Sequence, residues 1–169
     1  MPYIGLLSDT HCYFDDKLKS FFKDVDVLWH AGDFGNVETA NKIAAFKPLV
    51  GVYGNCDGYD VRAIHPYIQL LNVEGMKILM MHIGGYPGRY DSRAFALINA
   101  HRPDVFICGH SHILKVVNDR HYNMLTINPG AAGIQGFHLV RTALRFHIED
   151  GKIQDMEVGE WERKKQIEY

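Results

Sequence analysis

Three short apolar runs near the N-terminus constrain the fold of this chain most strongly. They span residues 3–8, 25–30 and 48–53. Each run is too continuous for an edge strand with alternating polar positions, and helical spacing fills the segments between them. This order predicts a β-α-β-α-β unit, and therefore an α/β fold built on buried parallel strands.

The two intervening segments predict amphipathic helices. Their apolar faces are Leu18, Phe21 and Phe22 in residues 15–24, and Val37, Ala40, Ile43 and Ala44 in residues 36–46. A third helix is predicted over residues 92–101.

The rest of the chain predicts further strands. Residues 68–82 read as a hairpin around Glu74 and Gly75, and residues 104–109 as another buried strand. Beyond His112, the Asn-Asp and Asp-Gly pairs predict turns between antiparallel strands. Residues 160–169 are expected to form a solvated tail or a final helical turn.

Size and charge limit the classes of function. The chain has 169 residues and a formal net charge of −2, so we expect one domain over residues 1–169 and no general attraction for nucleic acid. Neither a signal peptide nor a membrane span is predicted, and we expect a cytoplasmic protein. The three cysteines have no close pair spacing, which argues against a disulfide framework.

Polar residues follow nearly every predicted strand at its carboxyl end. They are Asp9 and His11, Asp33, Asn55, His82, and His110 and His112. Each motif alone has an ordinary explanation as a turn, a helix cap or an interior histidine. Because parallel strands bring their carboxyl ends to one edge, the whole set predicts a shared metal site.

The residue types indicate which metals this site would hold. Carboxylates, imidazoles and one amide suit manganese, iron, zinc, nickel or cobalt. Seven ligands are too many for one ion, but they fit two ions about 3.5–4 Å apart that share a bridging carboxylate. Such pairs clamp the attacking and leaving oxygens in phosphoryl transfer.

These motifs resemble a known family in order and spacing. Asp9-x-His11, Gly32-Asp33, Gly54-Asn55, His82, Gly109-His110-x-His112 and Asn128-Pro129-Gly130 are similar to the motifs of the calcineurin-like metallophosphoesterase superfamily, in particular its small bacterial and archaeal phosphodiesterases. The resemblance covers nearly the whole chain. It implies an α/β sandwich of two mixed sheets flanked by helices.

The resemblance also implies a dinuclear metal centre and a hydrolase. The first ion would be held by Asp9, His11 and His112, the second by Asn55, His82 and His110, and Asp33 would bridge them. The ions would be manganese, with nickel, iron, zinc, cobalt or magnesium as alternatives. Hydroxide between the ions would attack a small phosphodiester or phosphate ester, so no protein nucleophile is needed. Asn55 and His82 would act through the metal and by positioning the phosphate.

Cys56 replaces a histidine that serves many relatives as a general acid. The small phosphodiesterase branch also reads Gly-Asn-Cys-Asp, so the replacement indicates membership of that branch. A thiol has a pKa near 8.5 and is a poor substitute for imidazole. We reject Cys56 as a nucleophile, keep it as a candidate general acid, and favour a small buried residue beside the site.

Other polar residues have less definite roles. His30 is either a partner of the metal ligands or a structural residue, and Arg89 and Arg93 are either phosphate contacts or surface residues. No motif includes His65, His101, His121, His138 or His147. Ile83 after His82, and Ala131 after the Asn-Pro-Gly motif, depart from the usual pattern of the family and put borrowed substrate contacts in doubt.

Two other functions remain open. The retromer subunit of this fold is a protein-interaction scaffold, but its ligand pattern is eroded, whereas every ligand type is present here. A nuclease of the same superfamily is disfavoured by the acidic charge and the lack of an added DNA-binding domain. Relatives form dimers or tetramers, so a homo-oligomer is expected as a possible partner state.

Overall fold

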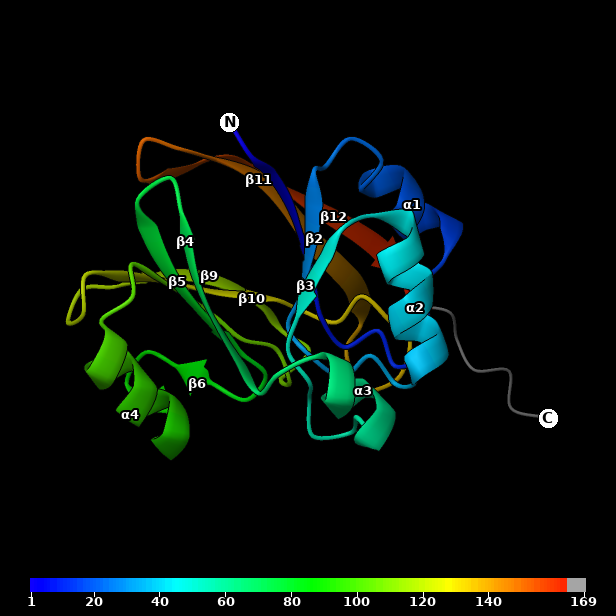
Figure 1. The fold of residues 1–169 in the computed structure, drawn as a ribbon, viewed down its shortest axis with the longest axis horizontal. Coiled ribbons are helices and arrows are strands. Elements are labelled where there is room, and N and C mark those ends of the chain that lie inside the picture. The colour runs from blue at the N-terminus through cyan, green and yellow to red at the C-terminus, as the bar shows by residue number, and fades with distance from the viewer. Residues whose placement is uncertain (164–169) are drawn as a thin grey trace.

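The fold is a sandwich of two mixed five-stranded sheets flanked by helices, seen in a computed structural model that describes residues 1–163 (Figure 1). The first sheet, in the order β12-β11-β1-β2-β3, contains β1 (Tyr3–Leu7), β2 (Val27–His30), β3 (Leu49–Gly51), β11 (Val140–Glu149) and β12 (Lys152–Glu162). The second, in the order β4-β5-β8-β10-β9, contains β4 (Ile68–Val73), β5 (Met76–Met81), β8 (Val105–Ile107), β9 (Leu114–Asp119) and β10 (Met124–Pro129). A small hairpin pairs β6 (Gly85–Tyr86) with β7 (Arg89–Tyr90). The helices are α1 (Asp16–Phe21), α2 (Val37–Phe46), α3 (Tyr59–Ile64) and α4 (Ser92–His101).

The main core lies between the two sheets. Strand residues of period two, such as Ile4 and Leu6 in β1 and Ile78 and Met80 in β5, belong to one buried cluster. A second cluster joins Leu28 of β2 to α1 and α2, and a third joins β5 and β8 to α4. The predicted sandwich flanked by helices is therefore confirmed.

Parallel pairing sets the position of the loops that follow the strands. In the first sheet β1 pairs with β2 and β2 with β3, both in parallel. In the second sheet β8 is parallel to both β5 and β10. The carboxyl ends of neighbouring strands therefore meet at one edge in each sheet, as the sequence pattern predicted.

Two helices differ from the sequence predictions. No helix was predicted over residues 59–64, where α3 forms with six residues. In α2, Ala44 is exposed and Thr39 is buried instead, with its hydroxyl bonded to the Asn36 cap at 2.6 Å. The buried amide and hydroxyl of Thr39 are therefore both satisfied, because its N–H also donates to Asn36.

The C-terminal strands also extend further than predicted. Asn118 and Asp119 pair with β10 inside β9, and the turn follows them. Residues 160–162 belong to β12 and pair with β11, so the predicted tail is wrong there. Residues 164–169 lie outside the described residues. Within residues 1–163, no helix is long and apolar enough to cross a bilayer.

Candidate metal centre

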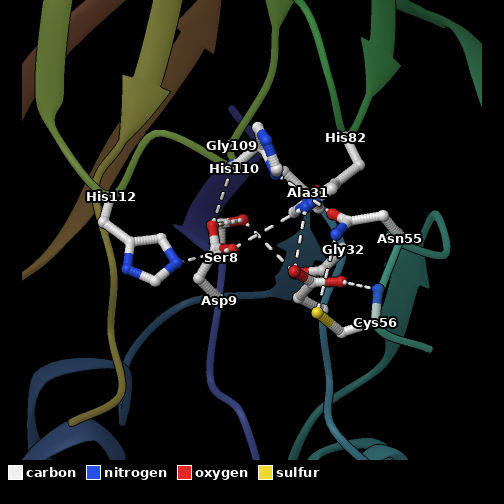
Figure 2. A network of polar contacts seen from close by, with 12 residues as sticks. Ser8, Asp9, Ala31, Gly32, Asn55, Cys56, His82, Gly109, His110 and His112 are labelled. Atoms are coloured by element: carbon white, nitrogen blue, oxygen red, sulfur yellow. Dashed lines mark hydrogen bonds and ion pairs between the residues drawn. The ribbon is translucent and has the colours of Figure 1, made fainter. Parts of the chain in front are cut away.

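The seven candidate ligands come together from loops that follow strands of both sheets. Figure 2 shows Asp9, Asn55, His82, His110 and His112 converging on one place. Asp9 and His11 follow β1, Asp33 follows β2, Asn55 follows β3, His82 follows β5, and His110 and His112 follow β8.

One group of side chains is built around Asp9. Its Oδ1 atom lies 3.2 Å from His112 Nε2 and 3.6 Å from His11 Nε2. Its Oδ2 atom accepts hydrogen bonds from the Ser8 hydroxyl at 2.7 Å and the His110 amide at 3.0 Å. The second oxygen is thus held by the protein while Oδ1 faces the two imidazoles.

A second group is built around His82. Its Nδ1–H donates to the Ala31 carbonyl at 2.7 Å, which leaves the lone pair on Nε2. That Nε2 atom lies 3.1 Å from Asp33 Oδ2. A ring nitrogen of His110 lies within 4.8 Å of ligand atoms of both His82 and Asp33, close enough for all three to bind one ion. His110 Nδ1 is 3.0 Å from Asn55 Oδ1.

Asp33 lies between the two groups. Its Oδ2 atom is 3.1 Å from His82 Nε2 and 3.5 Å from His11 Nε2. Its Oδ1 atom accepts the Cys56 amide at 2.8 Å. One carboxylate oxygen therefore faces imidazoles of both groups.

The donor atoms of this cluster fit a divalent cation. Asp9 Oδ1, His11 Nε2 and His82 Nε2 are buried and have no hydrogen-bond partner among residues 1–163. Buried polar atoms are rarely left without a partner, and carboxylate and imidazole lone pairs are metal donors. The convergence of three such atoms at one point is therefore the observation that favours a metal.

The charges within the cluster shift its pKa values. Burial would raise the pKa of Asp9, but His11, His112 and His82 outweigh it, and the pKa is lowered. Burial would lower the pKa of His82, but Asp33 and Asp9 outweigh it, and the pKa is raised. Protons and metal ions would therefore compete for the same imidazole nitrogens.

Most of the candidate ligands have an uncommon backbone conformation. Positive φ angles between 42° and 70° occur at Asp9, His11, Asp33, His110 and His112. Residues other than glycine hold such angles at a cost of about 1–3 kcal/mol each, typically where function requires it. The loops are therefore folded to aim these side chains.

Asp57 holds two of these loops together. Its buried carboxylate accepts the backbone amides of Asp33, Phe34, Gly35 and Gly54 at 2.9–3.2 Å. A Cβ at Gly54 would lie 2.1 Å from Asp33 Oδ1, so only glycine allows this approach. No role was predicted for Asp57, because three of its four partners are backbone amides in the loop after β2, which no local pattern connects to it.

His30 is a structural residue of the same loops. Its Nδ1 accepts the Gly32 amide at 3.1 Å, and its Nε2 lies 3.0 Å from the Thr10 hydroxyl, which donates to Phe34. The imidazole is therefore neutral with its proton on Nε2, and burial lowers its pKa to about 3. These contacts support a structural role for His30 and not a role as a partner of the metal ligands.

Asn128 secures the loop that carries His110 and His112. Its amide donates to the Gly109 carbonyl at 2.9 Å and to the Ser111 hydroxyl at 3.0 Å. Its Oδ1 accepts the Gly130 amide at 3.0 Å. The Asn-Pro-Gly motif thus supports the Gly-His-Ser-His motif.

Cys56 is exposed, so the expectation of a small buried residue is wrong. It lies beside the exposed Asn55 in the loop after β3, where its amide donates to Asp33 Oδ1 at 2.8 Å and its Sγ lies within 4.8 Å of an Asp33 carboxylate oxygen and a ring nitrogen of His11. Partial burial and the negative charge of Asp33 raise the pKa of the thiol. A protonated thiol agrees with the rejection of Cys56 as a nucleophile.

The cluster opens into three adjoining hollows. The largest, about 600 Å³, is lined by Asn55, Cys56, His110 and the exposed Ile113 and Phe137. Next to it, about 380 Å³ is enclosed by His110, Ile113, Tyr86, Arg89 and Lys115. A third, of about 210 Å³, is lined by Asn55, His82, Arg62 and Arg93. Arg89 and Arg93 thus lie in hollows beside the cluster.

Sequence reasoning also missed His138. Its Nδ1 atom lies 3.3 Å from His112 Nδ1, although no motif includes it. The loop over residues 133–138 carries it back to the cluster, and no local pattern signals that return.

Comparison of the sequence with known proteins identifies the same family that the motifs resemble. Residues 3–151 match the calcineurin-like phosphoesterase superfamily domain. The chain is 28% identical over 153 residues to a probable metallophosphoesterase of Methanocaldococcus jannaschii, across 87% of this chain and 76% of that protein.

Solved structures share the fold. An archaeal phosphodiesterase matches with a TM-score of 0.68 and 22% identity, over 92% of this chain and 99% of that one. Vps29 of Chaetomium thermophilum matches with a TM-score of 0.73 and 15% identity, over 97% and 100%. This chain belongs to the calcineurin-like phosphoesterase superfamily, and within it to the small metallophosphoesterases, which are metal-dependent hydrolases of phosphoester bonds.

Proposed function

We propose that this protein is a phosphodiesterase with a dinuclear metal centre, formed by a single domain. The observation that carries the proposal is the position of Asp33, whose Oδ2 atom faces His11 of one group and His82 of the other. A carboxylate oxygen shared between two groups of donors is what a pair of bridged ions requires.

The ligands follow from the two groups. We assign Asp9, His11 and His112 to the first ion, Asn55, His82 and His110 to the second, and Asp33 to both. Manganese is the metal we expect, with nickel, iron, zinc, cobalt and magnesium as alternatives. When bound, such ions activate a water molecule near neutral pH and neutralise charge on the phosphoryl group.

The protein's own residues orient this chemistry. The hydrogen bond from His82 to Ala31 fixes the tautomer that leaves Nε2 free, and the bonds from Ser8 and His110 fix Asp9. The exposed amide of Asn55 lines both the largest and the smallest hollow, where it can hold a phosphoryl oxygen. No side-chain nucleophile is proposed.

The shape of the surroundings supports a diester as substrate. A phosphodiester carries two alcohol groups, and the two larger hollows meet at His110 and Ile113. One group would lie against Phe137 and the other near Tyr86 and Lys115. A phosphate monoester would use only one of these spaces.

The test is metal-dependent hydrolysis of matched esters. Protein stripped with a chelator would be supplied with manganese, nickel, zinc or magnesium and assayed on bis-p-nitrophenyl phosphate and p-nitrophenyl phosphate. We expect activity that returns with metal and favours the diester. A preference for the monoester would overturn the diester assignment, and activity that persists without metal would overturn the mechanism.

Asp33→Asn tests the bridging assignment. We expect a loss of metal content and of activity, because an amide cannot share one anionic oxygen between two ions. Asp150→Asn, an equal change of charge at an exposed turn, is the matched control. Full metal content and activity in Asp33→Asn would contradict the assignment.

A non-catalytic scaffold is the alternative, and the likeness to the Vps29 fold is what favours it. The seven donor residues and the unpartnered buried atoms favour the enzyme instead. Metal binding without turnover of either ester would support the scaffold.

A further inference from the structure

We propose that His138 is a positioning residue that fixes the ring and the tautomer of His112 for metal binding. The proposal rests on the proposed function only in taking His112 as a ligand. It concerns a residue that no family motif of this chain includes.

The direction of each hydrogen bond follows from the carbonyl at one end. His138 Nε2 lies 2.8 Å from the Gly133 carbonyl, so that nitrogen carries the proton and donates. His138 Nδ1 is then an acceptor, and His112 Nδ1 lies 3.3 Å from it. His112 must therefore carry its proton on Nδ1, which leaves the lone pair on Nε2.

That lone pair points to the metal side. His112 Nε2 lies 3.2 Å from Asp9 Oδ1, the oxygen with no hydrogen-bond partner among residues 1–163 (Figure 2). The second nitrogen of a metal-binding histidine usually donates to a fixed acceptor, and that acceptor sets the tautomer. His138 supplies the acceptor here.

The same loop is fixed to Asp9. The Gly133 amide donates to the Asp9 carbonyl at 3.2 Å, while the Gly133 carbonyl accepts from His138. The contacts therefore form a closed circuit through Asp9, Gly133, His138 and His112. Because the circuit is closed, the ring of His112 is positioned relative to Asp9, its partner on the first ion.

The rings of His112 and His138 pack directly against each other. They lie edge to face, with centroids 5.1 Å apart at 81°. A Cβ at Gly136 would lie 2.4 Å from His112 Nδ1 and 3.1 Å from His138 Nδ1, so a side chain there would separate them. His112 keeps 17% of its side chain accessible, compared with 7% for His11 and 2% for His82, so less of its ring is held by packing and a hydrogen-bond partner contributes more to its position.

The experiment is a zinc titration of chelator-stripped protein in competition with a chromophoric chelator. We expect His138→Ala to weaken one binding step about 10–100-fold and to leave the other unchanged. His101→Ala is the matched control, since His101 is exposed at the end of α4 in a hollow away from the cluster. His138→Asn should restore most of the affinity, because its Oδ1 takes the place of Nδ1 as acceptor.

A spectroscopic measurement separates positioning from a general structural effect. In zinc-loaded, 15N-histidine-labelled protein, the Nδ1 proton of His112 should exchange slowly with water in the wild type and in His138→Asn, and rapidly in His138→Ala. Equal affinities and equal exchange in all variants would overturn the proposal. Equal loss in the Asn and Ala variants would also overturn it, because the acceptor would then not be what matters.

The outcomes remain distinct from those for the proposed function. Zinc binding weakened by His138→Ala in a protein that hydrolyses neither ester would support the positioning role and reject the enzyme. Unchanged zinc binding by His138→Ala, in a protein that hydrolyses the diester, would reject the positioning role and support the enzyme. A wild-type protein that binds no zinc would overturn both.

Discussion

Replacement of Asp57 by asparagine tests how the site is held in place. Oδ2 of Asp57 accepts three backbone amides, from Asp33, Phe34 and Gly54, and Oδ1 accepts the fourth, from Gly35. In Asp57→Asn the amide oxygen can take the place of Oδ2 and keep three bonds, but its NH2 group then faces the Gly35 amide.

The expected loss follows from counting these bonds. Three bonds change from charged to neutral acceptors, a weakening of about 1 kcal/mol each, and one bond is lost at about 1 kcal/mol because Gly35 is only partly buried. The sum is about 4 kcal/mol of unfolding free energy, a large part of the stability of a domain of this size. The backbone of Asp33 should also be less firmly positioned, because its amide bonds to Asp57.

The assay is urea unfolding at pH 7 with chelator present, so that metal binding does not contribute to the stability. Asp150→Asn is the control. It lies in an exposed turn at φ 51°, which asparagine also adopts, and should change the free energy by no more than about 0.5 kcal/mol. A change below about 1 kcal/mol in Asp57→Asn would refute the view that this carboxylate organises the two loops.

Three further predictions follow from the described residues. Because the pKa of His30 is lowered to about 3, the unfolded chain binds one more proton between that value and about 6.5. The stability contributed by neutral His30 should therefore fall as the pH falls, and urea unfolding should show the wild type losing about 2 kcal/mol relative to His30→Gln between pH 7 and pH 5; parallel curves would reject this. Cys56→Ser should keep diesterase activity within a few-fold, whereas loss of a general acid would lower the rate about 10²–10⁴-fold, most strongly for poor leaving groups. Manganese at about 100 times its dissociation constant should raise the free energy of unfolding by about 2.7 kcal/mol in thermal unfolding, and a melting temperature that does not respond to manganese would argue against a native metal site.

Local patterns predicted most of the strands. Buried parallel strands such as β1 and β8 read as continuous apolar runs, and the hairpin around Gly75 has an ordinary turn signal. The separation into two sheets was expected only from the family resemblance. It depends on pairings such as β1 with β11, which join segments more than 130 residues apart and leave no local trace.

Convergence of the seven candidate ligands was predictable because the ends of parallel strands meet. The supporting residues were less so. Asp57 and Ser8 act through backbone atoms or a neighbouring carboxylate, and His138 depends on the path of a loop. Cys56 was placed wrongly because residue type suggests burial, whereas the loop exposes the thiol.

Anomalous diffraction from crystals soaked in manganese would test the central claim most directly. The account predicts two manganese peaks about 3.5–4 Å apart, with Asp33 Oδ2 between them, Asp9, His11 and His112 on one ion, and Asn55, His82 and His110 on the other. A single peak, or two ions that do not share Asp33, would contradict it.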